Sequence, residues 1–191
     1  MPQSSVDLGL LLEESGAVLH GHFLLSSGRH SDVYVEKFRI LTQPQVLSAL
    51  CQEVAQHFAG EQVDLVAGPT TGGIIIAFEV ARQMGVPAVY VETEDGDKTL
   101  RRGQTIAAGA RVLVVDDVLT TGLSVNETIG AVIRFGGEVV GVGVLIDRAQ
   151  EGRDFGCPCF ASHKIQAESW AADDVPDWLA EIEVTKPGTR K

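Results

Sequence analysis

Two adjacent carboxylates, Asp116 and Asp117, follow an apolar run and precede a loop that is rich in hydroxyl groups. The whole segment reads RVLVVDDVLTTGLS, from Arg111 to Ser124. The loop leads into a predicted helix, whose free backbone N–H groups and positive dipole end favour a phosphate. Because the carboxylates repel a phosphate, they need sugar hydroxyls or a metal-bound water as partners. The segment therefore indicates a phosphorylated sugar, although the acids could also simply end a strand whose next helix is capped by Ser124.

Two further segments have residue types that suit an anionic ligand. The sequence AGPTTGG, at 67–73, follows an apolar strand and can form a nest of backbone N–H groups, or simply a tight glycine-rich turn. The polar stretch Glu92–Gly103 has no periodicity. It is either a solvated loop or a mobile lid that brings Lys98, Arg101 and Arg102 to a pyrophosphate.

Three other features give weaker signals. Arg148 follows the long apolar run 139–146, so it either reaches a ligand or pairs with a surface acid. The segment His20–Glu36 predicts a β-hairpin. Cys157 and Cys159 are too close together and too isolated to predict a zinc site.

The elements that position these residues alternate between strands and helices. The predicted strands are apolar on both faces, as in a buried parallel sheet; they are Val63–Ala67, Ala88–Val91, Arg111–Val115 and Val139–Ile146. The predicted helices are Gly73–Met84, Ser124–Phe135 and one that Pro44 opens and Gly60 ends. This alternation predicts an α/β fold with an open, mainly parallel twisted sheet flanked by helices. In such sheets ligands bind at the carboxyl ends of the strands, where Asp116 and Asp117 stand.

One structural domain with three parts is expected from 191 residues. The parts are residues 1–60, an N-terminal helix and hood packed on the core; residues 61–165, the α/β core; and residues 166–191, a C-terminal tail. Within the first part we expect a helix at Val6–Ser15 and strands at His22–Leu25 and Asp32–Glu36. Within the tail we expect one or two helical turns at Asp177–Glu183.

Composition excludes several classes of function. The net charge of −11 disfavours a nucleic-acid-binding protein. No apolar run reaches the roughly 18 residues of a membrane helix, and the acidic N-terminus does not resemble a secretory signal. The odd number of cysteines, three, fits a reducing cytoplasm better than a disulfide framework.

Two of these segments resemble known signatures. The string from Arg111 to Ser124 resembles the phosphoribosyl-pyrophosphate-binding motif of the type I phosphoribosyltransferases. The pattern F-x-L-x-S-G-R-x-S-x-x-Y, from Phe23 to Tyr34, is similar to the N-terminal signature of the orotate phosphoribosyltransferases, where it forms a hood over the base. The resemblance extends over residues 8–165, and the closing KPGTR at 186–190 is also similar to the family's C-terminal end.

The resemblance implies roles for individual residues. Asp116 and Asp117 would be catalytic and face the ribose hydroxyls. The other residues implied to bind phosphoribosyl pyrophosphate are Val118, Leu119, Thr120, Thr121, Gly122, Leu123 and Ser124 around the 5′-phosphate, Thr70, Thr71 and Gly72 in the pyrophosphate loop, and Lys98, Arg101 and Arg102 in the lid. Those implied to bind orotate are Arg148, Thr120, Ser27, Gly28 and Tyr34.

The sequence departs from the family pattern at several basic positions. Many bacterial members have a lysine at the position of Ser26 and another at the position of Gly72. They also have an R-K-x-x-K-x-H lid, whereas this chain has only Lys98, Arg101 and Arg102 there. These departures indicate a subfamily.

The resemblance implies a cytoplasmic orotate phosphoribosyltransferase of pyrimidine biosynthesis. Such an enzyme transfers ribose 5-phosphate from phosphoribosyl pyrophosphate to orotate, giving orotidine 5′-monophosphate and pyrophosphate. Mg²⁺ would be the cofactor, carried by the diphosphate rather than by protein ligands, and the enzyme would be a homodimer whose lid reaches the neighbour's site. Two alternatives remain: a phosphoribosyltransferase for another base, and a non-catalytic regulator that senses phosphoribosyl pyrophosphate.

Overall fold

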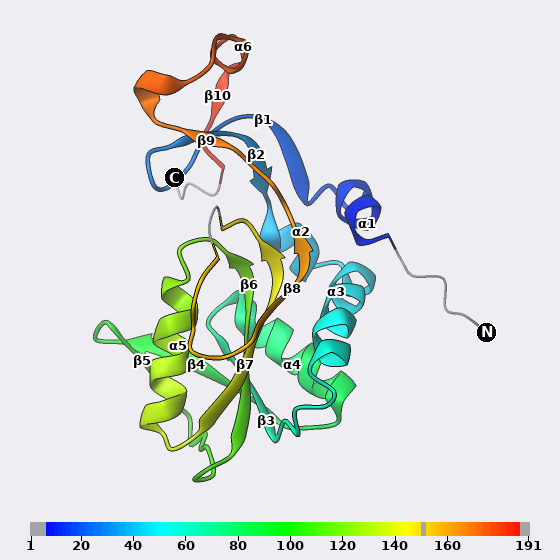
Figure 1. Cartoon of the computed structure of the whole chain (residues 1–191), viewed down its shortest axis with the longest axis vertical. Helices are drawn as coiled ribbons and strands as arrows, with labels where there is room; N and C mark the ends of the chain where they lie inside the picture. Colours follow the sequence, from blue (N-terminus) through cyan, green and yellow to red (C-terminus); the bar gives the residue numbers. More distant parts are fainter. Residues whose placement is uncertain (1–6, 150–151, 188–191) are drawn as a thin grey trace, which may run out of the picture.

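Six strands form the central sheet of the computed structural model, which describes residues 7–149 and 152–187 (Figure 1). In the order β5-β4-β3-β6-β7-β8, all neighbours are parallel except β5, which is antiparallel to β4. The strands are β3 (Leu65–Pro69), β4 (Ala88–Glu94), β5 (Asp97–Thr99), β6 (Arg111–Leu119), β7 (Glu138–Asp147) and β8 (Cys159–Lys164). The predicted α/β fold with an open, mainly parallel sheet is therefore confirmed.

Helices cover both faces of this sheet. The helices α3 (Pro44–His57) and α4 (Gly72–Met84) pack on one face, and α5 (Leu123–Arg134) packs on the other (Figure 1). Each face has its own apolar cluster, one around Leu50 of α3 and the other around Val132 of α5. Because both faces are buried, the core strands are apolar throughout, which is the pattern from which the sheet was predicted.

A second sheet of four strands lies beyond the carboxyl ends of the core strands, and we call it the hood (Figure 1). Its strands are, in sheet order, β10 (Val184–Thr185), β1 (Val18–Leu24), β2 (His30–Val35) and β9 (Ser169–Trp170). The hairpin β1–β2 was expected, with later starts for both strands. The two outer strands come from the C-terminal part of the chain, so both ends of the chain build the hood.

Short helices complete the structure: α1 (Leu8–Glu14), α2 (Lys37–Leu41), the 3₁₀ turn η1 (Ala172–Asp174) and α6 (Asp177–Ala180). The predicted first helix began at Val6, which lies outside the described residues. The α6 turn falls within the predicted range 177–183. Among the described residues, no helix is both long enough and apolar enough to cross a membrane.

Two sequence predictions near the site need correction. The strand before the acids was expected to end at Val115, but β6 continues to Leu119, so Asp116 and Asp117 lie within a strand. It continues because β7 extends alongside it, with Leu119 opposite Asp147. The segment Glu92–Gly103 was expected to lack regular structure, yet its first half forms the β4–β5 hairpin. The sequence analysis also missed α2 and β8.

Candidate active site

A pocket of about 490 Å³ lies between the hood and the carboxyl ends of β6 and β7. Its walls come from four stretches of the chain that are distant in sequence, the first of which contains both the hood hairpin and the start of α2. The lining residues are Leu24, Leu25, Ser26, Ser27, Tyr34 and Val35 from the hood hairpin, Lys37 from α2, Asp117, Val118, Thr120 and Thr121 from β6 and its loop, Arg148 after β7, and Pro187. The structure therefore gathers residues from the acidic segment, the hood signature and the end of β7.

The two acids of β6 are buried side by side. Asp116 and Asp117 each have a relative exposure of 8%. The backbone N–H of Asp117 donates to Oδ1 of Asp116 at 2.8 Å. Burial, and then the neighbouring charge of Asp117, raise the pKa of Asp116 to about 6 from its usual 3.8. Asp117 lines the pocket and Asp116 does not, so Asp117 is the carboxylate that can reach a ligand.

Lys37 is a pocket residue that the sequence analysis missed. Its ammonium lies 2.8 Å from Oδ2 of Asp117, and it is the first residue of α2. The only signal in the sequence was a basic residue three positions after Tyr34, and nothing there indicated that it turns toward an acid 80 residues away.

The glycine-rich turn after β3 is pressed against the acidic strand. A Cβ atom at Gly72 would lie 2.3 Å from Oδ2 of Asp117, so a larger residue would displace that carboxylate. A Cβ atom at Gly68 would lie 2.2 Å from the carbonyl oxygen of Gly73, so the turn can pack this tightly only because Gly68 has no side chain. The Thr70–Thr71 peptide bond is cis. Gly72 lies beside Asp117, whereas Thr70 and Thr71 are not among the residues that line the pocket.

The loop between β6 and α5 contributes Thr120 and Thr121 to the pocket lining. Gly122 turns the chain with a φ of 78°, a conformation that favours glycine, and α5 begins immediately afterwards. The 12-residue α5 thus starts beside the pocket. The side chain of Leu119 is buried in the core instead, and those of Leu123 and Ser124 do not line the pocket.

Arg148 links the end of β7 to the hood. Its Nη2 donates to the carbonyl oxygen of Val33 at 3.0 Å, while its Nε is buried and has no hydrogen-bond partner among the described residues. Tyr34 lies close to both Lys37 and Arg148, and its pKa is raised by burial and by Glu36. Ser27 lines the same pocket, but Gly28, with a φ of 80°, does not.

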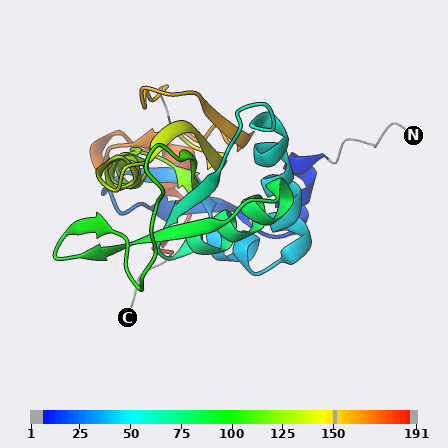
Figure 2. The same ribbon diagram turned by 90° about the horizontal axis from the view of Figure 1, so that it is seen from below.

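The three basic residues predicted for a lid lie apart from this pocket. Figures 1 and 2 show the β4–β5 hairpin projecting from the body of the protein. Lys98 donates to the hydroxyl of Thr93 at 3.1 Å on the hairpin itself. Arg101 and Arg102 pair with Glu94 at 3.2 Å and with Glu92 at 3.5 Å. Within one copy of the chain, these cations do not line the pocket.

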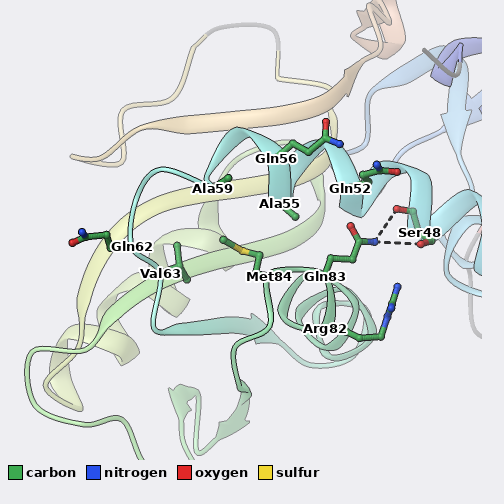
Figure 3. Close-up of a pocket in the computed structure, with 10 residues that line it drawn as sticks. All are labelled: Ser48, Gln52, Ala55, Gln56, Ala59, Gln62, Val63, Arg82, Gln83 and Met84. Atoms are coloured by element: carbon green, nitrogen blue, oxygen red, sulfur yellow. Dashed lines mark hydrogen bonds between the residues drawn. The ribbon is translucent and has the colours of Figure 1, made fainter. Parts of the chain in front are cut away.

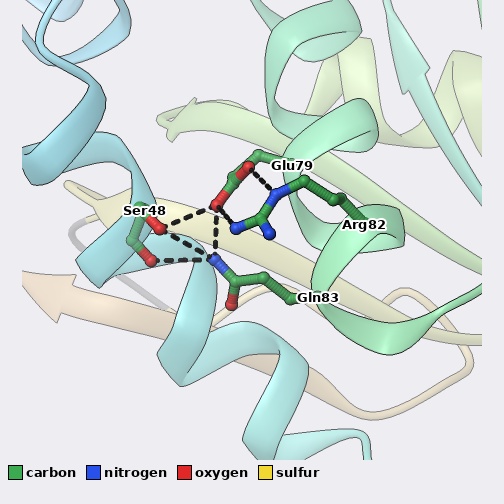
Figure 4. A network of polar contacts seen from close by, with 4 residues as sticks. All are labelled: Ser48, Glu79, Arg82 and Gln83. Carbon is green, nitrogen blue, oxygen red and sulfur yellow. Dashed lines mark hydrogen bonds and ion pairs between the residues drawn. The ribbon is translucent and has the colours of Figure 1, made fainter.

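A larger groove of about 670 Å³ lies between α3 and α4, on the outer side of the helices (Figure 3). It is lined mainly by amide and apolar side chains such as Gln52, Gln56 and Met84. Beside it, Glu79 accepts hydrogen bonds from Ser48, Arg82 and Gln83 (Figure 4). The Arg82 guanidinium is the main cause that lowers the pKa of Glu79, to about 2. This network joins α3 to α4, and the groove holds none of the predicted site residues.

Comparisons with known proteins show the family of this chain. The family model of the phosphoribosyl transferase domain matches residues 39–173. The orotate phosphoribosyltransferase of Caldanaerobacter subterraneus subsp. tengcongensis is 45% identical over 95% of both chains. The crystal structure of orotate phosphoribosyltransferase from Aeropyrum pernix has a TM-score of 0.68 and 32% identity, covering 83% of this chain and 93% of that one.

A further solved structure is that of the Mycobacterium tuberculosis H37Rv orotate phosphoribosyltransferase in complex with 5-phospho-alpha-D-ribosyl 1-diphosphate. It has a TM-score of 0.67 and 27% identity, and covers 83% of this chain and 96% of that one. The full-length relatives extend the likeness beyond the range of the family model, to almost the whole chain. The chain therefore belongs to the orotate phosphoribosyltransferases, a branch of the phosphoribosyl transferase family.

Proposed function

We propose that orotate and phosphoribosyl pyrophosphate react in the pocket between the hood and the β6–β7 edge. The observation that carries this proposal is the meeting of three groups there. Asp117 offers a carboxylate, Thr120 and Thr121 offer hydroxyls, and Arg148 offers a buried Nε that has no partner in the described part of the chain. A buried donor without a partner is costly, and an anionic acceptor on a ligand relieves that cost.

Each group has a separate role in this proposal. Asp117, supported by Asp116, accepts hydrogen bonds from the ribose hydroxyls. The loop of residues 118–124 and the start of α5 hold the 5′-phosphate through hydroxyl and backbone N–H groups. Arg148 binds the carboxylate of orotate, and Tyr34 and Ser27 lie on the hood side of the base.

The chemistry needs orientation and charge neutralisation more than proton transfer. The bond between C1 of the ribose and the diphosphate breaks through an oxocarbenium-like transition state, and N1 of orotate then bonds to C1. The N1–H of orotate loses its proton as the N1–C1 bond forms, and the departing diphosphate can accept that proton, so the pocket needs no strong general base of its own. The hood contributes by excluding water, which would otherwise attack C1.

Mg²⁺ fits this site as a partner of the diphosphate. Among residues 7–149 and 152–187, no group of three or more His, Cys, Asp or Glu side chains is placed to hold a metal. Asp117 is also already paired with Lys37. This donor set fits a cation that arrives bound to phosphate oxygens and keeps several waters. Bound there, Mg²⁺ neutralises charge on the leaving group.

The proposal includes a homodimer in a reducing cytoplasm. Three large apolar side chains are exposed on α2 and α4, two helices that contact each other: Phe38 at 53%, Ile75 at 42% and Phe78 at 64%. A second copy that covers this patch removes the apolar surface from water. It also gives the projecting β4–β5 hairpin a neighbouring site to reach. The cysteines Cys51, Cys157 and Cys159 are free thiols, which fits a reducing compartment.

An assay of orotate consumption tests the proposal. We expect consumption that requires both phosphoribosyl pyrophosphate and Mg²⁺. Adenine, hypoxanthine and uracil in about tenfold excess should leave the rate nearly unchanged, because they lack the carboxylate that Arg148 binds. A chain that consumed adenine or hypoxanthine faster than orotate would overturn the assignment of the base.

A further inference from the structure

Lys37 lines the pocket but has no role in the proposed function above. It follows the hood strand β2 by two residues and begins α2, so the hood and the core meet at this side chain. Its ammonium is 2.8 Å from Oδ2 of Asp117, and its side chain is 41% exposed, against 11% for Asp117. The ion pair is therefore open to the pocket on the lysine side.

The same carboxylate oxygen faces the glycine-rich turn. A Cβ atom at Gly72 would lie 2.3 Å from Oδ2 of Asp117 and 3.2 Å from Cδ1 of Leu41, which is the last residue of α2. Hence α2, the turn after β3 and the acid meet at one point. The Lys37 ammonium lies at that point, beside the turn that the family resemblance implies to be the pyrophosphate loop.

The two cations among the described pocket-lining residues lie on different sides of the pocket. Arg148 is held on the hood side by its hydrogen bond to the carbonyl oxygen of Val33. Lys37 is on the Gly72 side and bonds to Asp117 alone among the described residues. Burial lowers the pKa of Lys37, but the hydrogen bond to Asp117 and the charges of both acids outweigh burial and leave it raised. The side chain is thus an ammonium at neutral pH.

We propose that Lys37 is a substrate-binding cation that contacts the diphosphate of phosphoribosyl pyrophosphate. The proposal rests on the proposed function, of which it names a further residue. In the free protein, Asp117 holds the ammonium close to the turn. When the ribose hydroxyls approach Asp117, the ammonium swings to the diphosphate oxygens and neutralises charge on the leaving group. Lys37 keeps its proton throughout, because its role is electrostatic.

A different role would produce some of the same effects. If Lys37 served only as the counter-ion of Asp117, removing it would leave a bare carboxylate that repels the diphosphate. In that case, removing the charge of Asp117 as well would restore the affinity for diphosphate. If Lys37 contacts the diphosphate itself, the double variant stays weak. The comparison of single and double variants therefore separates a contact from simple charge compensation.

The experiment is a calorimetric titration of inorganic pyrophosphate, with Mg²⁺ present, into the full-length protein. The variants are Lys37→Met, Asp117→Asn, the double variant, and Arg39→Met as the matched control. Arg39 is an exposed cation on the same helix that lies beside Gly16, away from the pocket. Circular dichroism and the melting temperature establish that each variant is folded. If Lys37→Met does not fold, Lys37→Gln replaces it in both the single and the double variant.

We expect Lys37→Met to weaken pyrophosphate binding roughly tenfold to a hundredfold, as for a lost charge-assisted hydrogen bond. Arg39→Met should stay within about twofold of the original protein, and the double variant should remain about tenfold weak or worse. In the orotate assay, Lys37→Met should raise the KM for phosphoribosyl pyrophosphate and lower kcat, with the KM for orotate changed less than about twofold.

Recovery of pyrophosphate affinity in the double variant would overturn the proposal, and so would an equal rise in both KM values. The titration contains no orotate, so its outcome does not depend on the identity of the base. If the protein does not consume orotate but Lys37→Met still weakens pyrophosphate binding, the proposed base specificity is wrong and the proposed diphosphate contact stands. If Lys37→Met consumes orotate as well as the original protein does, the proposed function stands and the proposed diphosphate contact is wrong.

Discussion

The guanidinium of Arg148, just after β7, donates a hydrogen bond of 3.0 Å to the carbonyl oxygen of Val33 in the hood strand β2. One nitrogen of this side chain thus fastens the hood to the core, while its Nε is buried without a partner among the described residues. The residue assigned to the base therefore also couples the two sheets that enclose the pocket.

Replacing Arg148 with alanine should raise the KM for orotate more than the KM for phosphoribosyl pyrophosphate. The lost charge-assisted hydrogen bond corresponds to roughly tenfold to a hundredfold in the KM for orotate. Steady-state kinetics with each substrate varied in turn measure the two constants. Arg148→Lys is the control that keeps the charge and loses the planar guanidinium. Equal changes in both KM values would mean that Arg148 acts only by holding the hood.

Asp117→Asn should lower turnover by more than about tenfold while the protein stays folded, because a charged acceptor for the ribose hydroxyls is lost. Asp116→Asn should have the milder effect, since Asp117 lines the pocket and Asp116 does not. Turnover at saturating substrate and circular dichroism measure the two properties. Near-normal turnover in a folded Asp117→Asn protein would remove this residue from the reaction.

The stability of Asp116→Asn should depend on pH. Burial raises the pKa of Asp116 from 3.8 to about 6. Between pH 3.8 and about pH 6 this residue ionises more readily in the unfolded chain than in the folded protein, so the folded protein loses stability as the pH rises. Removing the charge should therefore stabilise the protein above pH 6, by up to about 3 kcal/mol, and give almost no gain near pH 4. Urea unfolding at several pH values measures the difference. A gain that is independent of pH would contradict the buried, strained carboxylate.

Alanine at Lys98, Arg101 or Arg102 should slow turnover without lowering the melting temperature. The Arg101–Glu94 pair is about half exposed on both sides, and in the Arg102–Glu92 pair the arginine side chain is 70% exposed. Ion pairs with such exposed cations add little to stability. Lys164→Ala, on the exposed end of β8, is the control and should be neutral.

A mixing experiment asks whether the hairpin acts on a neighbouring copy. Combining an Arg102→Ala chain with an Asp117→Asn chain should restore some activity, because one hybrid site then has both original residues. Subunit exchange must be shown by mass or by labelled chains. If exchange occurs and no activity returns, the hairpin does not act across the dimer.

Glu79→Gln should destabilise the protein but leave turnover unchanged. Glu79 accepts hydrogen bonds from Ser48 on α3 and from Arg82 and Gln83 on α4, at 2.7 to 2.8 Å. Its pKa is lowered to about 2, so its carboxylate stabilises the fold fully above pH 4.5 and loses that effect as pH falls toward 2. We expect a loss of about 1–3 kcal/mol at neutral pH. Glu53→Gln, exposed on α3, is the control for charge removal.

The core sheet and several residues that line the pocket could be predicted from the sequence. Strands β3, β6 and β7 have continuous apolar runs, and α5 has an apolar face, so local periodicity was enough to predict them. Asp117, Thr120 and Arg148 follow such strands directly. Their meeting follows from the rule that the carboxyl ends of parallel strands share one edge.

The features that depend on contacts between distant segments could not be predicted from the sequence. Lys37 meets Asp117 across 80 positions, and no local pattern encodes that pairing. The hood strands β9 and β10 have two residues each, too few to show an alternation. They become strands only because the edges of β2 and β1 offer unpaired backbone groups. The periodicity of apolar residues indicates which face of a helix or strand is buried. Contacts between distant segments depend instead on the three-dimensional path of the chain.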